Sequence, residues 1–101
     1  MTTRKYRSFS DPGHGWLRVP HTDLDALGIS DQISTYSYQN GDWVYLEEDC
    51  DLTLFMKTAD KAGWTVAMTH TTSNNPSSIR NFHHYQKPRR PFIGQQPLTL
   101  D

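Results

Sequence analysis

The feature that most constrains this fold is the pair Asn40-Gly41, which lies inside the run 33–48. Asn-Gly between two alternating segments is the strongest short-range signal for a β-hairpin, because a type I′ turn needs positive φ at both central residues. A two-residue loop also fixes the register, so we expect Tyr38 to face Trp43 across the strands. The residues expected on one face are Tyr36, Tyr38, Trp43 and Tyr45, and those on the other are Ile33, Val44 and Leu46.

The aromatic face of this hairpin has two interpretations. Four exposed rings would provide a stacking surface or a contact surface for a partner, because aromatic side chains with arginine are enriched in interface hot spots. Alternatively, the rings form the hydrophobic core beneath the helices, and the face that carries Ile33, Val44 and Leu46 lies outside or in a homodimer. The sequence leaves both open.

The rest of the chain predicts more strands and two helices around this hairpin. The expected elements, in chain order, are strands 6–9 and 16–19, a short helix 23–27, the hairpin, an amphipathic helix 51–62, a strand 64–70 and one or two helical turns within 77–85. We therefore expect one α+β domain of residues 1–86, with a small antiparallel sheet of three to four strands and two helices on one face. A ferredoxin-like arrangement is one form of this fold. Residues 87–101 contain three prolines and predict an extended tail.

Composition narrows the classes of function. The formal net charge is −1, which argues against a general polyanion binder. The lone Cys50 cannot form an intramolecular disulfide, which fits a reducing compartment. Residues 1–10 lack the apolar stretch of a secretory signal, and no run is long enough to span a bilayer. We therefore expect a cytoplasmic protein without a membrane partner.

The loop 11–16 is the second notable feature, because glycines stand on both sides of His14. Such glycines allow the backbone to approach a ligand closely. In this interpretation Asp11, His14 and Trp16 contact a ligand or partner. The alternative is a tight turn capped by Asp11, with an exposed imidazole.

The segment 77–80 brings together Ser77, Ser78 and Arg80 at an expected helix start. Hydroxyls, unpaired backbone amides and a guanidinium within one turn suit a phosphate group. The alternative is a capped helix in which Arg80 pairs with Glu47 or Asp49.

The acidic run 47–51 lies where a strand leads into a helix. Alternation puts Glu47 on the aromatic face and Glu48 on the other, so that one acid borders a binding surface and the other meets solvent or a basic partner. The five histidines (14, 21, 70, 83 and 84) show no metal-ligand spacing. Carboxylates beside Cys50 raise the pKa of a thiol, which disfavours a nucleophile. We therefore expect no metal, no cofactor and no catalytic residue.

Three segments together resemble a group of small bacteriophage and prophage proteins that have no assigned activity. These are SDPGHGWL (10–17), YLEEDCD (45–51) and SSIR (77–80), and the resemblance extends over residues 8–85. The resemblance implies a biological context for the protein, but it implies neither a fold nor the residues of a site. Short phage accessory proteins are often binders that interfere with host enzymes or antiviral systems, in the cytoplasm of the bacterial host.

The sequence thus predicts a small phage-type, non-catalytic binding protein that inhibits or sequesters a host or defence component, either a protein or a nucleotide signal. One alternative is a single-stranded nucleic-acid binder that stacks bases on the aromatic face. Another is a small metal-dependent hydrolase that uses His14, Glu48 and His70. The expected ligand- or partner-binding residues are Asp11, His14, Trp16, Tyr36, Tyr38, Trp43, Tyr45, Glu48, Ser77, Ser78 and Arg80.

Overall fold

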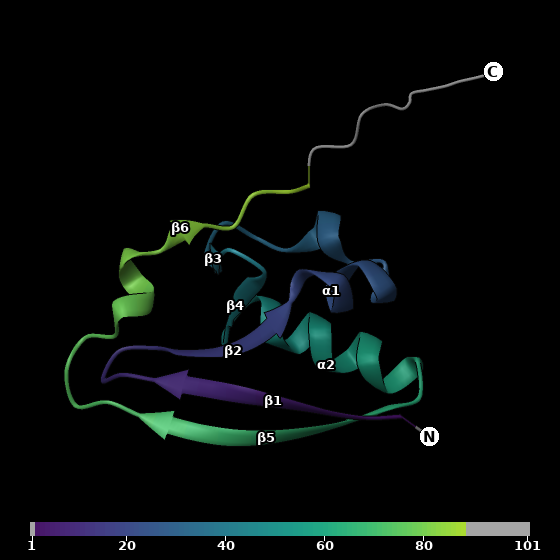
Figure 1. Cartoon of the computed structure of the whole chain (residues 1–101), viewed down its shortest axis with the longest axis horizontal. Helices are drawn as coiled ribbons and strands as arrows, with labels where there is room; N and C mark the ends of the chain where they lie inside the picture. Colours follow the sequence, from purple (N-terminus) through teal and green to yellow (C-terminus); the bar gives the residue numbers. More distant parts are fainter. Residues whose placement is uncertain (1, 89–101) are drawn as a thin grey trace.

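The computed structural model describes residues 2–88, which form one mixed six-stranded sheet with two α-helices (Figure 1). The strands are β1 (Thr2–Ser10), β2 (Gly15–Pro20), β3 (Tyr38–Asn40), β4 (Trp43–Glu47), β5 (Trp64–Thr72) and β6 (His83–His84). The helices are α1 (His21–Leu27) and α2 (Asp51–Lys61), and two 3-10 turns, η1 (Ser30–Gln32) and η2 (Ser78–Asn81), complete the list.

The strand order in the sheet is β5-β1-β2-β4-β3-β6, in which β1 and β5 are parallel and all other neighbours are antiparallel. The α+β class and the two helices are confirmed. The expectation of three to four antiparallel strands is wrong. After β4 the chain crosses through α2 and returns as β5, which pairs with β1 along its whole length, and the short β6 extends the opposite edge. Periodicity identifies a strand but does not identify its partner.

The ferredoxin-like alternative is also wrong. That arrangement joins its first two strands through a helix, whereas here a tight loop joins β1 directly to β2 as an antiparallel hairpin. The helix α1 follows the second strand instead.

The Asn-Gly hairpin is present, but its register differs from the prediction. Tyr38 pairs with Tyr45, and Asn40 pairs with Trp43, so that the two-residue loop is Gly41-Asp42. Gly41 has φ +60°, the left-handed region that favours glycine. The residue of β4 that faces Tyr38 is thus two positions further along the chain than predicted. Because side chains alternate between the two faces of a sheet, each side chain still lies on the predicted face.

The main core lies between the sheet and both helices. Fully buried side chains come from the central strands (Leu17, Val19, Val44 and Leu46), from α1 (Leu24) and from α2 (Phe55). The helices therefore cover the face that carries Val44 and Leu46, not the aromatic face. The alternative in which the hairpin rings form the core beneath the helices is wrong.

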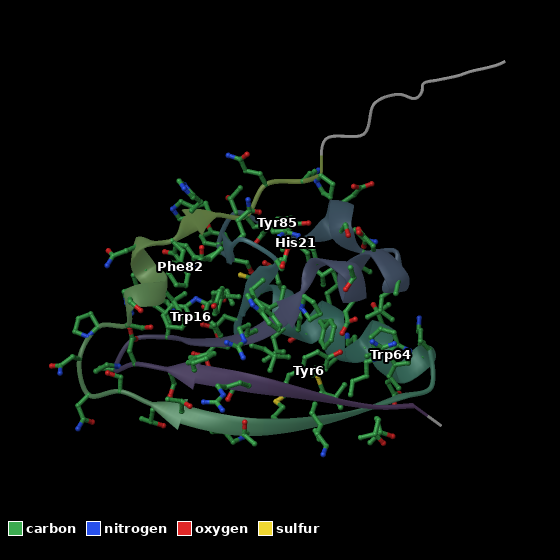
Figure 2. The ribbon with its side chains drawn as sticks, viewed as in Figure 1. Tyr6, Trp16, His21, Trp64, Phe82 and Tyr85 are labelled. Atoms are coloured by element: carbon green, nitrogen blue, oxygen red, sulfur yellow. The ribbon has the colours of Figure 1, made fainter. Side chains whose placement is uncertain are left out.

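A second, smaller cluster covers part of the aromatic face. Trp16, Tyr45 and Ile79 are buried in it, and Phe9, Tyr38 and Phe82 pack against them. Ile79 belongs to η2 and Phe82 follows it, so the segment between β5 and β6 lies over the rings of the sheet (Figure 2). The helical turns expected within 77–85 are a single 3-10 turn followed by β6.

Tyr85 anchors the end of the described chain in the main core. It is 1% exposed, its hydroxyl donates to the carbonyl of Ser30 at 2.6 Å, and its backbone N–H donates to the carbonyl of Ser37 at 2.8 Å. Its ring also stacks on His21 (Figure 2). Of the predicted tail 87–101, residues 89–101 lie outside the described residues.

The helices within residues 2–88 are short. They have 7 and 11 residues, and neither is long and apolar enough to cross a bilayer.

We expect Tyr85→Ala to lower the free energy of unfolding by about 3–5 kcal/mol, as truncation of buried aromatic side chains does. Tyr85→Phe should cost about 1–3 kcal/mol, because it leaves the Ser30 carbonyl without its donor. Urea unfolding followed by circular dichroism measures both. Tyr36→Ala is the control, since Tyr36 is 69% exposed. Equal losses for the substitutions at positions 85 and 36 would contradict the anchoring role.

Candidate functional site

Two hollows lie among the predicted site residues and their neighbours. One has a volume of about 280 Å³ and is lined by His14, Trp16, Tyr38, Glu47, Asp49 and Arg80, among others; we call it the His14 pocket. The other is larger, about 680 Å³, and its lining includes Arg4, Lys5, Arg7, Arg18, Asp23 and Trp43; we call it the arginine groove.

The loop that carries His14 is held by the buried carboxylate of Asp11. One oxygen, Oδ1, accepts hydrogen bonds from the backbone N–H groups of Gly13 and His14, both at 3.0 Å. The other, Oδ2, accepts one from the backbone N–H of Ser77 at 2.8 Å. These bonds tie the β1–β2 loop to the segment that begins η2.

Arg80 completes this arrangement. Its Nε–H donates to Oδ2 of Asp11 at 2.7 Å and a terminal N–H donates to Oδ1 at 2.8 Å, a bidentate ion pair. The guanidinium and the Ser77 amide hold the pKa of Asp11 far below its usual range. A Cβ atom at Gly13 would lie 2.8 Å from a guanidinium nitrogen of Arg80, so the glycine permits this approach.

The segment 77–80 therefore stabilises the loop. The Ser77 hydroxyl accepts from the backbone N–H of Ile79 at 3.2 Å, and Ser78 is an exposed residue at the start of η2. The carboxylate that pairs with Arg80 is Asp11, not Glu47 or Asp49 as the alternative had it.

His14 faces acidic residues across the pocket. Its Nδ1 lies 3.1 Å from Oε2 of Glu47, and Oε1 of Glu47 accepts a hydrogen bond from the backbone N–H of Asp49 at 2.7 Å. The predicted acid, Glu48, is exposed and lies beside Gly15 instead. The alternation of side chains had placed Glu47 on the aromatic face. It made no prediction for the side chain of Asp49, because Asp49 follows the end of the strand.

Cys50 also lines the His14 pocket. Desolvation raises the pKa of its thiol, and the nearby carboxylates of Glu47, Asp51 and Asp49 raise it further. The thiol is therefore held in its protonated form, as its neighbours in the sequence predict.

The aromatic residues of the hairpin are divided among three surroundings. Tyr36 and Tyr38 line the His14 pocket, Trp43 lines the arginine groove, and Tyr45 is buried under Phe82, whose ring centroid lies 5.1 Å away. Tyr36 precedes β3 and is 69% exposed. The four rings thus do not form one continuous platform.

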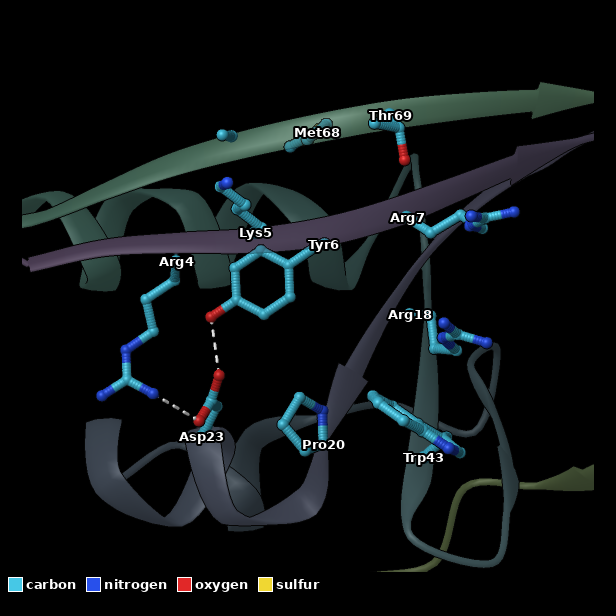
Figure 3. A pocket seen from close by; sticks show the side chains of 11 residues that line it. Arg4, Lys5, Tyr6, Arg7, Arg18, Pro20, Asp23, Trp43, Met68 and Thr69 are labelled. Atoms are coloured by element: carbon cyan, nitrogen blue, oxygen red, sulfur yellow. Dashed lines mark hydrogen bonds and ion pairs between the residues drawn. The ribbon is translucent and has the colours of Figure 1, made fainter.

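The arginine groove lies where two neighbouring strands diverge. β1 and β2 pair from Arg7 and Arg18 to the loop, and beyond that point β1 follows β5 while β2 follows β4 (Figure 3). Arg7 and Arg18 are a directly opposed cross-strand pair at the point of divergence. Within residues 2–88 neither guanidinium has a carboxylate partner.

Hydrogen bonds to Asp23 connect the side chains of Arg4 and Tyr6 in another wall of the groove. Arg4 donates to Oδ1 of Asp23 at 2.9 Å, and the hydroxyl of Tyr6 donates to Oδ2 at 2.6 Å. Burial, followed by the hydrogen bond to Asp23, raises the pKa of Tyr6 well above its usual range, so the phenol stays protonated as a donor. Each oxygen of Asp23 thereby accepts one hydrogen bond.

Aromatic rings flank Arg18. Its guanidinium carbon lies 4.4 Å from the ring centroid of Trp43 and 5.7 Å from that of Phe9. Trp43 is 39% exposed. Sequence reasoning identified Trp43 but missed Arg7 and Arg18, because no local pattern shows that they become opposed on neighbouring strands.

Comparisons with protein-family models, with curated proteins and with solved structures found no match for this chain.

We expect Asp11→Asn to flatten the dependence of stability on acid pH. A lowered folded-state pKa means that the Asp11 contribution is present in full above the unfolded-state value, about 3.9, and is lost as pH falls toward the lowered value. The wild type should therefore lose more stability than Asp11→Asn between pH 5 and about 2, measured by urea unfolding at each pH. Asp31→Asn, at an exposed aspartate, should retain the wild-type slope. Parallel curves for the wild type and Asp11→Asn would contradict the assignment.

Proposed function

We propose that this protein is a non-catalytic binding protein that sequesters a phosphate-bearing nucleotide ligand in the arginine groove. One observation carries the proposal: Arg7 and Arg18 are directly opposed across two strands, beside the partly exposed ring of Trp43, with no carboxylate partner within residues 2–88. The resemblance to phage accessory proteins adds a context in which sequestering a nucleotide signal has a use.

Electrostatics favours an anion at this position. Like charges directly opposite one another in a sheet are destabilising, and a phosphate between Arg7 and Arg18 would remove that repulsion. The planar guanidinium also binds phosphate through two parallel hydrogen bonds. The volume of the groove, about 680 Å³, lies within the usual range for small-ligand sites.

The nearby ring suits a nucleobase. Trp43 already lies against the guanidinium of Arg18, so a base stacked on the exposed part of the ring would bring its phosphate toward the arginines. A lone phosphate would leave this surface unused.

The groove carries the features of a binding site for an anion. Among the described residues that line the groove, Asp23 is the one with a carboxylate. One of its oxygens accepts a hydrogen bond from Arg4 and the other accepts one from Tyr6. The hydrolase hypothesis, which used His14, Glu48 and His70, loses support because His70 pairs with the hydroxyl of Ser8 and does not line the His14 pocket.

The phosphate could come from a free nucleotide or from a single-stranded nucleic acid, which present the same chemistry to the groove. The net charge of −1 favours the compact ligand, since a long strand binds through many cations.

We expect a nucleoside diphosphate to bind with one site per chain by isothermal titration calorimetry. Arg7→Ala and Arg18→Ala should each weaken binding about tenfold or more, as loss of a charged hydrogen bond worth about 1.5–3 kcal/mol does. Lys57→Ala removes one charge from an exposed position of α2 and should leave the affinity unchanged. Absent binding, or equal weakening in all three variants, would refute the proposal. Tighter binding of a single-stranded oligonucleotide, with steep salt dependence, would assign the phosphate to nucleic acid.

We expect Trp43→Ala to separate the base from the phosphate. Loss of one stacking partner should cost about 1–3 kcal/mol of nucleotide binding. The affinity for inorganic phosphate, measured by the same titration, should not change. A variant that loses both ligands equally would show that Trp43 acts by positioning Arg18 and that the base is not stacked.

A further inference from the structure

We infer that the His14 pocket is a binding site for a first-row divalent transition metal such as Zn²⁺, held by His14, Glu47 and Asp49. This inference is independent of the proposed nucleotide site, which lies in the other hollow. One ligand atom from each of the three side chains lies within 4.8 Å of the other two. An imidazole with two carboxylates and an open position is a donor set that zinc accepts in proteins.

The three donors come from different parts of the fold. His14 lies in the β1–β2 loop, Glu47 ends β4, and Asp49 lies in the turn before α2. Sequence spacing could not indicate this set, because 33 residues separate His14 from Glu47.

The charge at the cluster calls for a cation. The side chain of Glu47 is 9% exposed, and its partners are the imidazole of His14, the backbone N–H of Asp49 and the thiol of Cys50. Within residues 2–88 no lysine or arginine pairs with Glu47 or Asp49, and Arg80, which lines the same pocket, is paired with Asp11. A nearly buried carboxylate beside a second carboxylate is costly unless positive charge accompanies it.

An unpaired buried donor belongs to one of the residues that line this pocket. Trp16 is 3% exposed and lines the pocket, and its indole N–H is buried without a hydrogen-bond partner among the described residues. Buried donors are nearly always satisfied in folded proteins. A metal held by three protein ligands keeps water or an anion at its open position, and Trp16 lies in the wall of the pocket that would surround such a ligand.

Other contacts orient two of the three donors, Glu47 and His14. The Asp49 amide fixes the orientation of the Glu47 carboxylate, and the Asp11–Arg80 ion pair fixes the loop that carries His14. Such outer contacts orient metal ligands in proteins. Asp49 is exposed, so its side chain has room to close the remaining distance.

The test is a calorimetric titration of the full-length, untagged protein with ZnCl₂. Separate titrations with MgCl₂ and CaCl₂ provide the comparison. We expect one Zn²⁺ per chain, much weaker binding of Mg²⁺ and Ca²⁺, and a visible Co²⁺ absorption spectrum of a site with nitrogen and oxygen ligands. His14→Ala and Asp49→Asn should each weaken Zn²⁺ binding at least about tenfold, since the first removes a ligand and the second removes the negative charge of another.

His70→Ala is the matched control, because it removes an exposed histidine that lies outside the pocket. It should bind Zn²⁺ like the wild type. Asp49→Asn keeps the test valid if His14→Ala fails to fold, since Asp49 is exposed. Absent Zn²⁺ binding, unchanged affinity in both pocket variants, or an equal loss in His70→Ala would overturn the inference.

Discussion

The interaction on which the functional surfaces depend is the ion pair between the buried carboxylate of Asp11 and the partly exposed guanidinium of Arg80. The Asp11 carboxylate accepts from the loop amides, from the Ser77 amide and from the guanidinium, so one side chain joins the β1–β2 loop to the segment before β6. That segment places Ile79 and Phe82 over the rings of Trp16 and Tyr45. Loss of Arg80 would leave the buried carboxylate of Asp11 without its cation, which would weaken both the cover of the aromatic face and the position of His14.

The same pairing separates the molecule into surfaces of opposite character. Arg80 is engaged by Asp11, so the acids Glu47 and Asp49 remain without a guanidinium partner within residues 2–88. On the other side of the covered rings, the divergence of β1 and β2 leaves Arg7 and Arg18 opposed over a groove. One hollow therefore suits a cation and the other an anion, although the whole chain has a net charge of only −1.

Local physical chemistry predicted the secondary structure well. Asn40-Gly41 predicted a hairpin, and alternation separated Tyr38 and Tyr45 from Val44 and Leu46 even though the register was displaced by two residues. The strand partners could not be predicted in this way. The parallel pairing of β5 with β1, and the return of Tyr85 to the core, join residues that are far apart in the chain, and no local periodicity records them.

Residue types and their spacing predicted five of the six strands and both helices, and they identified the loop around His14 and the segment 77–80 as carrying reactive side chains. They did not predict β6, and they left open which face of the hairpin forms the core. What those side chains contact could be read from the fold alone. Arg80 could have met a ligand, Glu47 or Asp49, and the fold brought it to Asp11. Arg7 and Arg18 are opposed over the groove because two strands that pair near the loop then separate. Which side chains meet depends on contacts between segments that are far apart in the chain. Residue type and local spacing carry no information about those contacts.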